Sequence, residues 1–472
     1  MDGKYLALDL GAESGRAMFA RLAEGKIELT ELHRFANTPV QLPTGLYWDT
    51  LRLFHEICEG IRASCKAADE LDGLAIDTWG VDFGLIGNGE LLHNPRHYRD
   101  ARTDGVMEEV FVRVPRIQIY EQTGLQFMPI NSLYQLYCIQ RDSPELLDAA
   151  SQLLFMPDLF NYFLTGTVAV ERTIASTSQF YDPTRKAFAT DLLRQLDISA
   201  KFLPGLIDPG MELGSVLPYV AERCGLKHDL KVYTAGSHDT ASAVAAVPAQ
   251  PGENWCYISS GTWSLMGIEL QRPLINDTAL EANFTNEVGV DSTIRFLKNI
   301  PGLWLLQECR RAWAKEGHDY SYADLMQRAS AARSIDTILD LDQFLSPGNH
   351  PRRICEFCRK TQQEAPQDPG STTRVILQSL AARYAEVLNV LEQLTGRSLE
   401  VVHIVGGGSQ NRLLNQLTAN AIGRRVIAGP SEATAAGNAL TQAMGADDIN
   451  SLEELRSVVR ASFSLEEFRP QN

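Results

Sequence analysis

The first residues of the chain alternate between short apolar runs and turns that contain glycine. Residues 5–10, 15–22 and 26–35 form short strand-like runs, and turns at Gly11 and Gly25 lie between them. Runs of this length between turn residues are typical of β-strands with tight connections. We therefore expect three consecutive strands at the N-terminus.

The spacing of apolar residues changes after Asp49, which can cap a helix. The next apolar segment, residues 74–86, indicates two strands around Gly80. An order of three strands, a helix and a further strand requires a mixed sheet with a helical crossover to a parallel strand. The helix is predicted by apolar side chains at three- and four-residue spacing, namely Leu53, Phe54, Ile57, Cys58, Ile61 and Cys65.

A comparable order of elements recurs in the second half of the chain. We expect an α/β protein with two lobes of similar plan, 1–247 and 248–472, joined near residues 245–254 and enclosing a ligand cleft. A C-terminal helix within roughly the last 25 residues is expected to pack back on the first lobe. The second lobe is predicted from strands at 255–270, 293–300 and 399–408 and from helices at 302–317, 373–396 and 411–423.

Composition and charge restrict the classes of function. The 472 residues are 44% hydrophobic, which suits an ordered globular protein, and 43 basic against 59 acidic residues give a formal net charge of −16. This charge argues against binding to nucleic acid or to anionic membranes. Asp9 interrupts the first apolar run, so we expect no signal peptide and a cytoplasmic protein.

Eight cysteines are too dilute in a chain of this length to form a disulfide framework. Cys355 and Cys358 form the only closely spaced pair, and neither a second pair nor a nearby histidine completes a zinc site. We expect reduced thiols, although the sequence leaves a redox pair open.

The stretch from Thr234 to Val244, TAGSHDTASAV, places one acid among residues with very little side-chain bulk. Small neighbours leave room for a ligand to approach the backbone, and His238 and Asp239 supply the strong polar groups. Asp239 has two interpretations here. It can cap the alanine-rich helix that follows, or it can act as a general base in a cleft.

Three loops that contain glycine each follow an expected strand, at residues 9–16, 259–264 and 405–411. Glycine lets backbone N–H groups converge on phosphate oxygens, and the third loop also opens a helix, whose N-terminus favours anions. None of the loops matches a P-loop or a dinucleotide-binding motif. The three loops together favour a nucleotide held between the lobes. Asp9, at the end of the first strand, could help to hold Mg²⁺ or could simply end the strand in a turn.

Eight segments stand in this order along the chain: LDLGAESGR, IDTWGVDF, YRDARTDG, MPDLFNYFLTG, SHDTASAV, SSGTWSLMG, FLKNIPGLWLLQ and HIVGGGSQNRLLNQL. Together they resemble the FGGY carbohydrate kinases, and within them the bacterial L-rhamnulokinase branch. The resemblance runs from about residue 4 to about residue 445, and its most specific pieces are IDTWGVDF, SHDTASAV and SSGTWSLMG. It implies two actin-like, ribonuclease-H-like lobes with Mg²⁺, ATP and a sugar meeting between them.

The resemblance also implies a role for individual residues. Asp239 matches the catalytic base, and Asp9 matches the acid associated with magnesium. Position 13 carries Glu where this branch tends to have a small residue, so its side chain should point outward or act through the metal, because a carboxylate facing a triphosphate is repelled. The positions that match sugar contacts are Gly80, His238, Asp239, Thr240 and Asn299; those that match ATP contacts are Ala12, Glu13, Ser14, Gly15, Arg16, Thr262, Gln307, Gly406, Gly407 and Gly408.

The function implied by the resemblance is phosphorylation of L-rhamnulose at its 1-hydroxyl by ATP. Two alternatives stay open at this point: a kinase for another ketose such as L-fuculose or L-ribulose, and a non-catalytic protein that senses sugar on the same fold. A small-molecule sugar is the expected partner, and the sequence leaves open whether the protein is a monomer or a homodimer.

Overall fold

The structure, a computed structural model, describes residues 2–471 and divides into two compact units. Unit 1 consists of residues up to 246 together with 269–296 and 433–462, and unit 2 consists of 247–268, 297–432 and the residues from 463 on. Each unit is therefore assembled from three separate stretches of the chain. The linear division at residues 247 and 248 stays a prediction.

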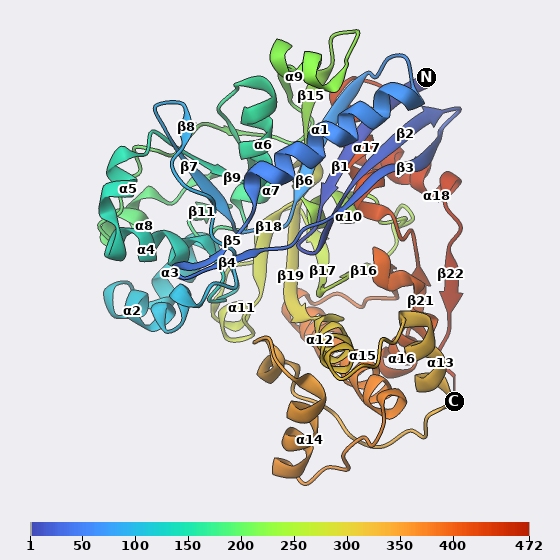
Figure 1. Ribbon diagram of the computed structural model, residues 1–472. Coiled ribbons are helices and arrows are strands. Elements are labelled where there is room, and N and C mark those ends of the chain that lie inside the picture. Colours follow the sequence, from blue (N-terminus) through green and yellow to red (C-terminus); the bar gives the residue numbers. More distant parts are fainter. Residues whose placement is uncertain (1, 472) are drawn as a thin grey trace. The chain divides into compact units, whose positions relative to one another are not determined.

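Unit 1 is built on a six-stranded mixed sheet in the order β14-β15-β6-β1-β2-β3 (Figure 1). Strand β1 pairs antiparallel with β2 and parallel with β6, and β6 pairs parallel with β15. The predicted mixed sheet and its helical crossover are therefore confirmed. The strands span Asp2–Leu10 (β1), Ser14–Ala23 (β2), Lys26–Ala36 (β3), Gly73–Thr78 (β6), Glu212–Ser215 (β14) and Lys231–His238 (β15).

Alternation along the strands gives this sheet two different faces. Leu6, Leu8 and Leu10 of β1 join the apolar cluster that includes Leu53 and Ile57 of helix α1 (Thr50–Ala67). The opposite face packs against helices α10 (Asp239–Ala245) and α17 (Ala433–Gly445), and Figure 1 shows α1 and α17 on opposite sides of the strands. Because β-strand side chains alternate, Asp9 of β1 and Asp77 of β6 fall on the α17 face.

Helices α10 and α17 approach each other closely. A Cβ on Gly437 of α17 would overlap the carbonyl oxygen of Ser242 in α10. Only glycine permits this backbone contact, so α10 and α17 can pack directly against each other.

The remaining parts of unit 1 form smaller sheets and surrounding helices. Strands β8, β7 and β9 form one small sheet, and α18 packs against β3, where Oγ of Ser462 accepts a 2.8 Å hydrogen bond from the N–H of Ile27. The bounds are Val40–Leu42 (β4), Gly45–Tyr47 (β5), Phe83–Gly87 (β7), Glu90–Leu91 (β8), Ala101–Thr103 (η1), Val106–Arg113 (α2), Arg116–Thr123 (α3), Ser132–Asp142 (α4), Pro144–Ala149 (α5), Gln152–Phe155 (β9), Met156–Thr165 (α6), Val170–Glu171 (β10), Arg172–Ala175 (α7), Tyr181–Asp182 (β11), Ala187–Phe188 (β12), Thr190–Gln195 (α8), Leu206–Ile207 (β13), Pro218–Cys224 (α9), Asp277–Glu281 (α11), Thr285–Val288 (β18), Val290–Ser292 (η2) and Leu452–Ser462 (α18).

Unit 2 repeats the core of this plan. Strand β16 pairs antiparallel with β17 and parallel with β20, β20 pairs parallel with β21, and β21 pairs antiparallel with β22. The bounds are Trp255–Ser260 (β16), Trp263–Leu270 (β17), Ile294–Pro301 (β19), Trp304–Lys315 (α12), Tyr322–Ala331 (α13), Leu341–Phe344 (η3), His350–Lys360 (α14), Pro369–Thr395 (α15), Val401–Val405 (β20), Gly407–Gln410 (η4), Arg412–Ile422 (α16), Arg425–Ala428 (β21) and Glu466–Phe468 (β22).

Among residues 2–471, no helix combines the length and the apolar character that a membrane crossing requires.

Candidate active site

Asp239 is the first residue of α10, directly after the buried strand β15. The N-cap position belongs to His238, and no side-chain hydrogen bond caps this helix, so the interpretation of Asp239 as a cap is wrong. The Asp239 side chain is 31% exposed, and its Oδ1 accepts a 2.9 Å hydrogen bond from Oγ1 of Thr240. Burial raises the pKa of Asp239 above its usual value, and the adjacent His238 opposes this rise.

The structure brings the predicted sugar-contacting residues of unit 1 together. Nε2 of His238 lies 3.5 Å from Oδ1 of Asp239. A Cβ built on Gly80 would lie 3.4 Å from the same Nε2 and 3.3 Å from Oγ1 of Thr177. Gly80 thus keeps free a space beside the imidazole that any larger residue would narrow.

A buried carboxyl group holds the backbone that leads to Asp239. Oε2 of Glu171 accepts hydrogen bonds from the N–H of Ser237 at 3.2 Å and from Oγ1 of Thr173 at 2.5 Å, and Oγ1 of Thr173 in turn accepts the N–H of His238 at 3.1 Å. Burial raises the pKa of Glu171 to about 7. Sequence reasoning missed Glu171, because nothing in its local pattern links it to a segment more than sixty residues away.

The first predicted phosphate loop is the tight turn between β1 and β2. Asn37 holds this turn from both sides, since its Nδ2 donates to the Gly11 carbonyl and its N–H donates to the Glu13 carbonyl, both at 2.9 Å. The side chain of Glu13 is exposed, and a Cβ on Gly15 would overlap the ring of Phe35. Ala12 and Ser14 are half-buried on the same turn.

Asp9 and Asp77 lie opposite each other on the parallel strands β1 and β6. Oδ2 of Asp9 accepts a 2.5 Å hydrogen bond from Arg16, while Oδ2 of Asp77 accepts one of 2.6 Å from Nδ2 of Asn438 on α17. Burial, followed by the negative charges of Asp9 and Asp239, raises the pKa of Asp77 well above its usual value.

The predicted nucleotide residues of unit 2 also come together. Nε2 of Gln307 donates a 3.2 Å hydrogen bond to Oγ1 of Thr262, and the Thr262 carbonyl accepts the N–H groups of Gly302 and Trp304 at 3.1 and 3.2 Å. These bonds attach the β16–β17 turn to the start of α12. Asn299, predicted to contact sugar, is half-buried on β19 in unit 2.

The glycine run at the end of β20 packs on the same turn. Gly406 has a φ of 81°, which favours glycine, and its N–H donates a 3.0 Å hydrogen bond to the carbonyl of Pro430. A Cβ on Gly408 would overlap the side chain of Ser260, whereas a Cβ on Gly407 would meet no atom within 4 Å. The second and third glycine loops therefore form one continuous surface.

This surface fits a nucleotide. Oε1 of Gln307 is buried and accepts no hydrogen bond from the residues that the structure describes, so it lacks the partner that a buried acceptor normally has. The open space over Gly407 admits a phosphate or ribose close to the backbone. Asp9 offers carboxylate oxygens, which are the ligands that a magnesium ion prefers. The described residues contain no group of three or more His, Cys, Asp or Glu side chains that could hold a metal ion by themselves.

Trp79, which precedes Gly80, is part of the core of unit 1. Its ring lies 4.0 Å from that of Trp48, only 4% of the residue is exposed, and its Nε1 donates a 2.9 Å hydrogen bond to Asp82. Asp82 also accepts from Nε1 of Trp48 and Nε2 of Gln135 at 2.6 and 2.8 Å. This network anchors the loop that contains Gly80.

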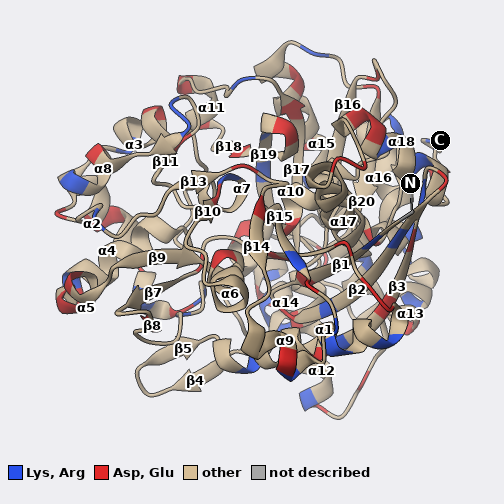
Figure 2. Ribbon diagram, turned by 90° about the horizontal axis from the view of Figure 1, so that it is seen from above, with Lys and Arg blue, Asp and Glu red and all other residues tan. Residues whose placement is uncertain are grey.

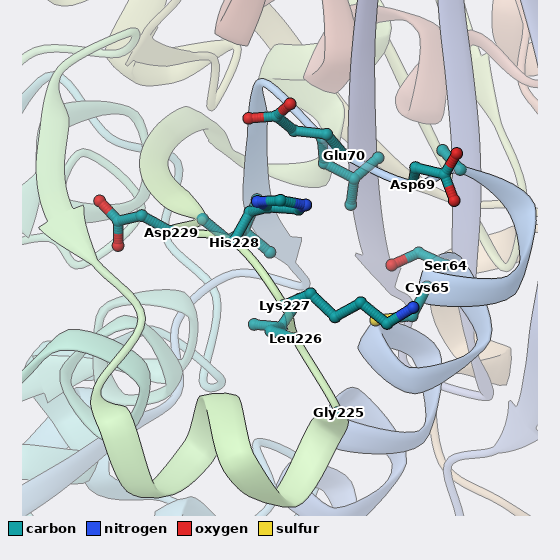
Figure 3. Close-up of a pocket in the computed structure, with 12 residues that line it drawn as sticks. Ser64, Cys65, Asp69, Glu70, Gly225, Leu226, Lys227, His228 and Asp229 are labelled. Atoms are coloured by element: carbon teal, nitrogen blue, oxygen red, sulfur yellow. The ribbon is translucent and has the colours of Figure 1, made fainter.

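A separate pocket lies away from the predicted site residues, between the end of α1 and the connection from α9 to β15 (Figure 3). Cys65, Lys227 and His228 line it, and none of them was predicted to contact sugar or nucleotide. All eight cysteines have free thiols, including Cys355 and Cys358 on α14.

Models of known families match both halves of the chain. The N-terminal domain of the FGGY family of carbohydrate kinases matches residues 4–246, and the C-terminal domain of the same family matches residues 256–446. Among solved structures, the chain resembles gluconate kinase from Lactobacillus acidophilus, with a TM-score of 0.80 and 14% identity over 100% of this chain and 94% of that one. It also resembles Plasmodium falciparum glycerol kinase with ADP, with a TM-score of 0.78 and 15% identity over 100% of this chain and 94% of that one. These likenesses confirm the predicted α/β class with two actin-like units.

Curated relatives are similar over almost their whole length. A protein named rhamnulokinase from Bacteroides thetaiotaomicron is 41% identical to this chain, over 100% of this chain and 97% of that protein. A protein of the same name from Bacillus subtilis is 39% identical, over 99% of this chain and 96% of that protein. A third, from Oceanobacillus iheyensis, is 39% identical over 98% of this chain and 97% of its own length. The chain belongs to the FGGY family of carbohydrate kinases.

Proposed function

We propose that the chain transfers the γ-phosphoryl group of ATP to the 1-hydroxyl of L-rhamnulose in the cytoplasm, giving L-rhamnulose 1-phosphate and ADP in L-rhamnose catabolism. One observation carries the choice of sugar: the relatives named rhamnulokinase are 38–41% identical along nearly the full chain. A kinase that uses ATP is what membership of the family implies.

In this proposal Asp239 is the catalytic base. Its carboxylate takes the proton of the 1-hydroxyl as that oxygen attacks the γ-phosphorus, and the bond between the γ-phosphorus and the bridging oxygen breaks so that ADP leaves. His238, Thr240, Gly80 and Asn299 bind the sugar. The position of Asp239 at the start of α10, with its carboxylate partly exposed beside His238, supports this role.

The nucleotide is assigned to two groups of residues. A bound Mg²⁺ would neutralise phosphate charge, and Asp9 is the residue proposed to hold it through retained waters. The hydrogen bond between Gln307 and Thr262 and the open backbone at Gly407 support the assignment in unit 2. The proposed ATP contacts are Ala12, Glu13, Ser14, Gly15, Arg16, Thr262, Gln307, Gly406, Gly407 and Gly408.

The test is release of ADP from Mg-ATP with L-rhamnulose, run beside L-fuculose, L-ribulose, D-xylulose and a sample without sugar. We expect kcat/KM for L-rhamnulose to exceed that for each other sugar by at least ~10-fold, because a pocket that hydrogen-bonds specific hydroxyls discriminates strongly against misplaced ones. Preference for another ketose would overturn the choice of substrate, and ADP release independent of every sugar would overturn the kinase assignment.

A further inference from the structure

Two buried charged side chains lie behind His238. Arg295 on β19 has no exposed surface, and Glu287 on β18 is 4% exposed. The guanidinium NH2 nitrogen of Arg295 lies 3.2 Å from Nδ1 of His238 and 3.2 Å from Oε2 of Glu287. Neither charged residue is among those that the sequence or the family resemblance assigned a role.

The contact between Arg295 and His238 decides which ring nitrogen carries the proton. A guanidinium group has only N–H donors, so in the 3.2 Å hydrogen bond Arg295 donates and Nδ1 accepts. Nδ1 must then be unprotonated, and in a neutral imidazole the proton is on Nε2.

Glu287 would favour the other tautomer, with the proton on Nδ1, because its Oε2 lies 3.3 Å from Nδ1 and could accept a hydrogen bond from it. However, this buried Oε2 accepts no well-directed hydrogen bond from the described residues, so a hydrogen on Nδ1 would not point at it. Glu287 instead supplies the counter-charge that a fully buried Arg295 requires, and Nε of Arg295 donates to the Val288 carbonyl at 3.1 Å.

The other side of the imidazole faces the predicted sugar site. Nε2 lies 3.5 Å from Oδ1 of Asp239 and beside the space that Gly80 keeps free. A proton on Nε2 can be donated to a sugar oxygen or to the Asp239 carboxylate. A lone pair on Nε2 would instead face that carboxylate and repel it.

We propose that Arg295, held by Glu287, is a positioning residue that fixes the tautomer of His238 with the proton on Nε2, so that His238 serves as a hydrogen-bond donor beside Asp239. This inference rests on the proposed sugar kinase function for its consequence, because the donor would orient the sugar for attack. The tautomer itself can be measured without substrate, so its failure is distinguishable from failure of the proposed function.

The first experiment is a long-range ¹H–¹⁵N spectrum of the full-length wild-type protein with labelled histidine, assigned by the loss of one signal set in His238→Gln. We expect the His238 ring to show a protonated Nε2 and an unprotonated Nδ1, with the same pattern in Glu287→Gln, because Arg295 still donates there. A protonated Nδ1 in the wild type, or a tautomer that changes in Glu287→Gln, would overturn the proposal.

The second experiment measures kinetics of Arg295→Met and Arg295→Lys. We expect Arg295→Met to lower kcat and to raise KM for the sugar by ~10-fold each, with KM for ATP unchanged, because it removes a hydrogen bond from a charged donor. Arg295→Lys keeps one donor and should recover part of the loss. Loss of the Nε2 tautomer preference in the spectrum should accompany the kinetic change.

Arg456 offers a matched control, because the stretches 269–296 and 433–462, which contain Arg295 and Arg456, both belong to unit 1. Arg456 is also an almost buried arginine, with its side chain 10% exposed and paired with Glu269 at 2.6 Å, and it donates to the Val244 carbonyl near the end of α10 rather than to His238. Arg456→Met should leave kcat and the sugar KM within ~2-fold of the wild type. Equal kinetic effects of Arg295→Met and Arg456→Met would reduce the role of Arg295 to stability and overturn the proposal.

Discussion

At the scale of single residues, Asp239 carries the chemistry of the account. It is the first residue of α10, its carboxylate is partly exposed, and it makes no cap for the helix. Asp239→Asn removes the group that accepts the hydroxyl proton and keeps the shape of the side chain. We expect turnover to fall by about 10²-fold or more with ATP affinity retained, measured by sugar-dependent ADP release and by calorimetric titration of ATP.

The control for Asp239→Asn is Asp277→Asn. Asp277 is likewise the first residue of a short helix, α11, and it is exposed. The same change there removes a carboxylate from a helix N-terminus outside the predicted site, so only Asp239→Asn should lose turnover. Wild-type turnover in Asp239→Asn would contradict the assignment of the base.

Glu171 gives a pH-dependent prediction for stability. Its pKa rises from the ordinary 4.5 to about 7 because of burial, so folding favours the protonated carboxyl group. The stabilisation from this group is complete below about pH 4.5 and is lost as the pH rises through about 7; integrated over that shift, the loss is on the order of 3 kcal/mol.

The measurement is the free energy of unfolding by urea at pH 5 and pH 7.5 for the wild type and Glu171→Gln. The loss of stability between these values should be larger in the wild type than in the variant, because the variant lacks the titrating group. Equal losses in both proteins would show that Glu171 keeps an ordinary pKa.

The sequence predicted the residues that stand in distinctive local patterns. Asp239 among small residues and the glycines after strands could be found because their own neighbours are unusual. Glu287 and Asn37 could not, since their partners are set by strand pairing and loop packing rather than by adjacent residues. Arg295 left a weak signal, a charged residue within the apolar strand of residues 293–300.

At the scale of elements, the glycine run after β20 makes a prediction with an internal control. A Cβ on Gly407 meets open space, whereas a Cβ on Gly408 overlaps Ser260. Gly407→Ala should therefore keep the thermal unfolding temperature while raising KM for ATP by ~10-fold, because the methyl group occupies space assigned to the nucleotide. Gly408→Ala should lower the unfolding temperature by several degrees, since it displaces the Ser260 side chain.

Both variants are read by differential scanning calorimetry and by steady-state kinetics with varied ATP. An unchanged KM for ATP in Gly407→Ala would contradict the placement of the nucleotide over this loop. An unchanged unfolding temperature in Gly408→Ala would contradict the close packing of the two glycine loops.

Element boundaries were predictable where capping residues stand in the sequence. The helix after Asp49 was confirmed at Thr50–Ala67, with Asp49 accepting the N–H of Arg52 at 3.3 Å. The helix predicted over 373–396 begins earlier, at Pro369, because Asp368 and Ser371 form a capping box and proline suits the first turn. Periodicity alone does not detect such a start.

At the scale of the whole molecule, both units repeat a mixed sheet in which an antiparallel hairpin continues on one side into two consecutive parallel pairs. The sequence predicted this repetition from the order of apolar runs. It did not predict that 269–296 and 433–462 belong to unit 1, because contacts between distant segments leave no periodic signal. Acidic residues outnumber basic ones and both are spread over many elements (Figure 2), which fits a small-molecule substrate better than a polyanion.

The most direct test of the central claim is the ³¹P spectrum of a reaction containing the wild-type protein, Mg-ATP and L-rhamnulose. We predict that the γ-phosphate signal of ATP is replaced, one for one, by ADP and by a phosphomonoester coupled to the protons on carbon 1 of the sugar. ADP with free inorganic phosphate and no phosphomonoester, or a phosphomonoester on another carbon, would contradict transfer to the 1-hydroxyl of L-rhamnulose.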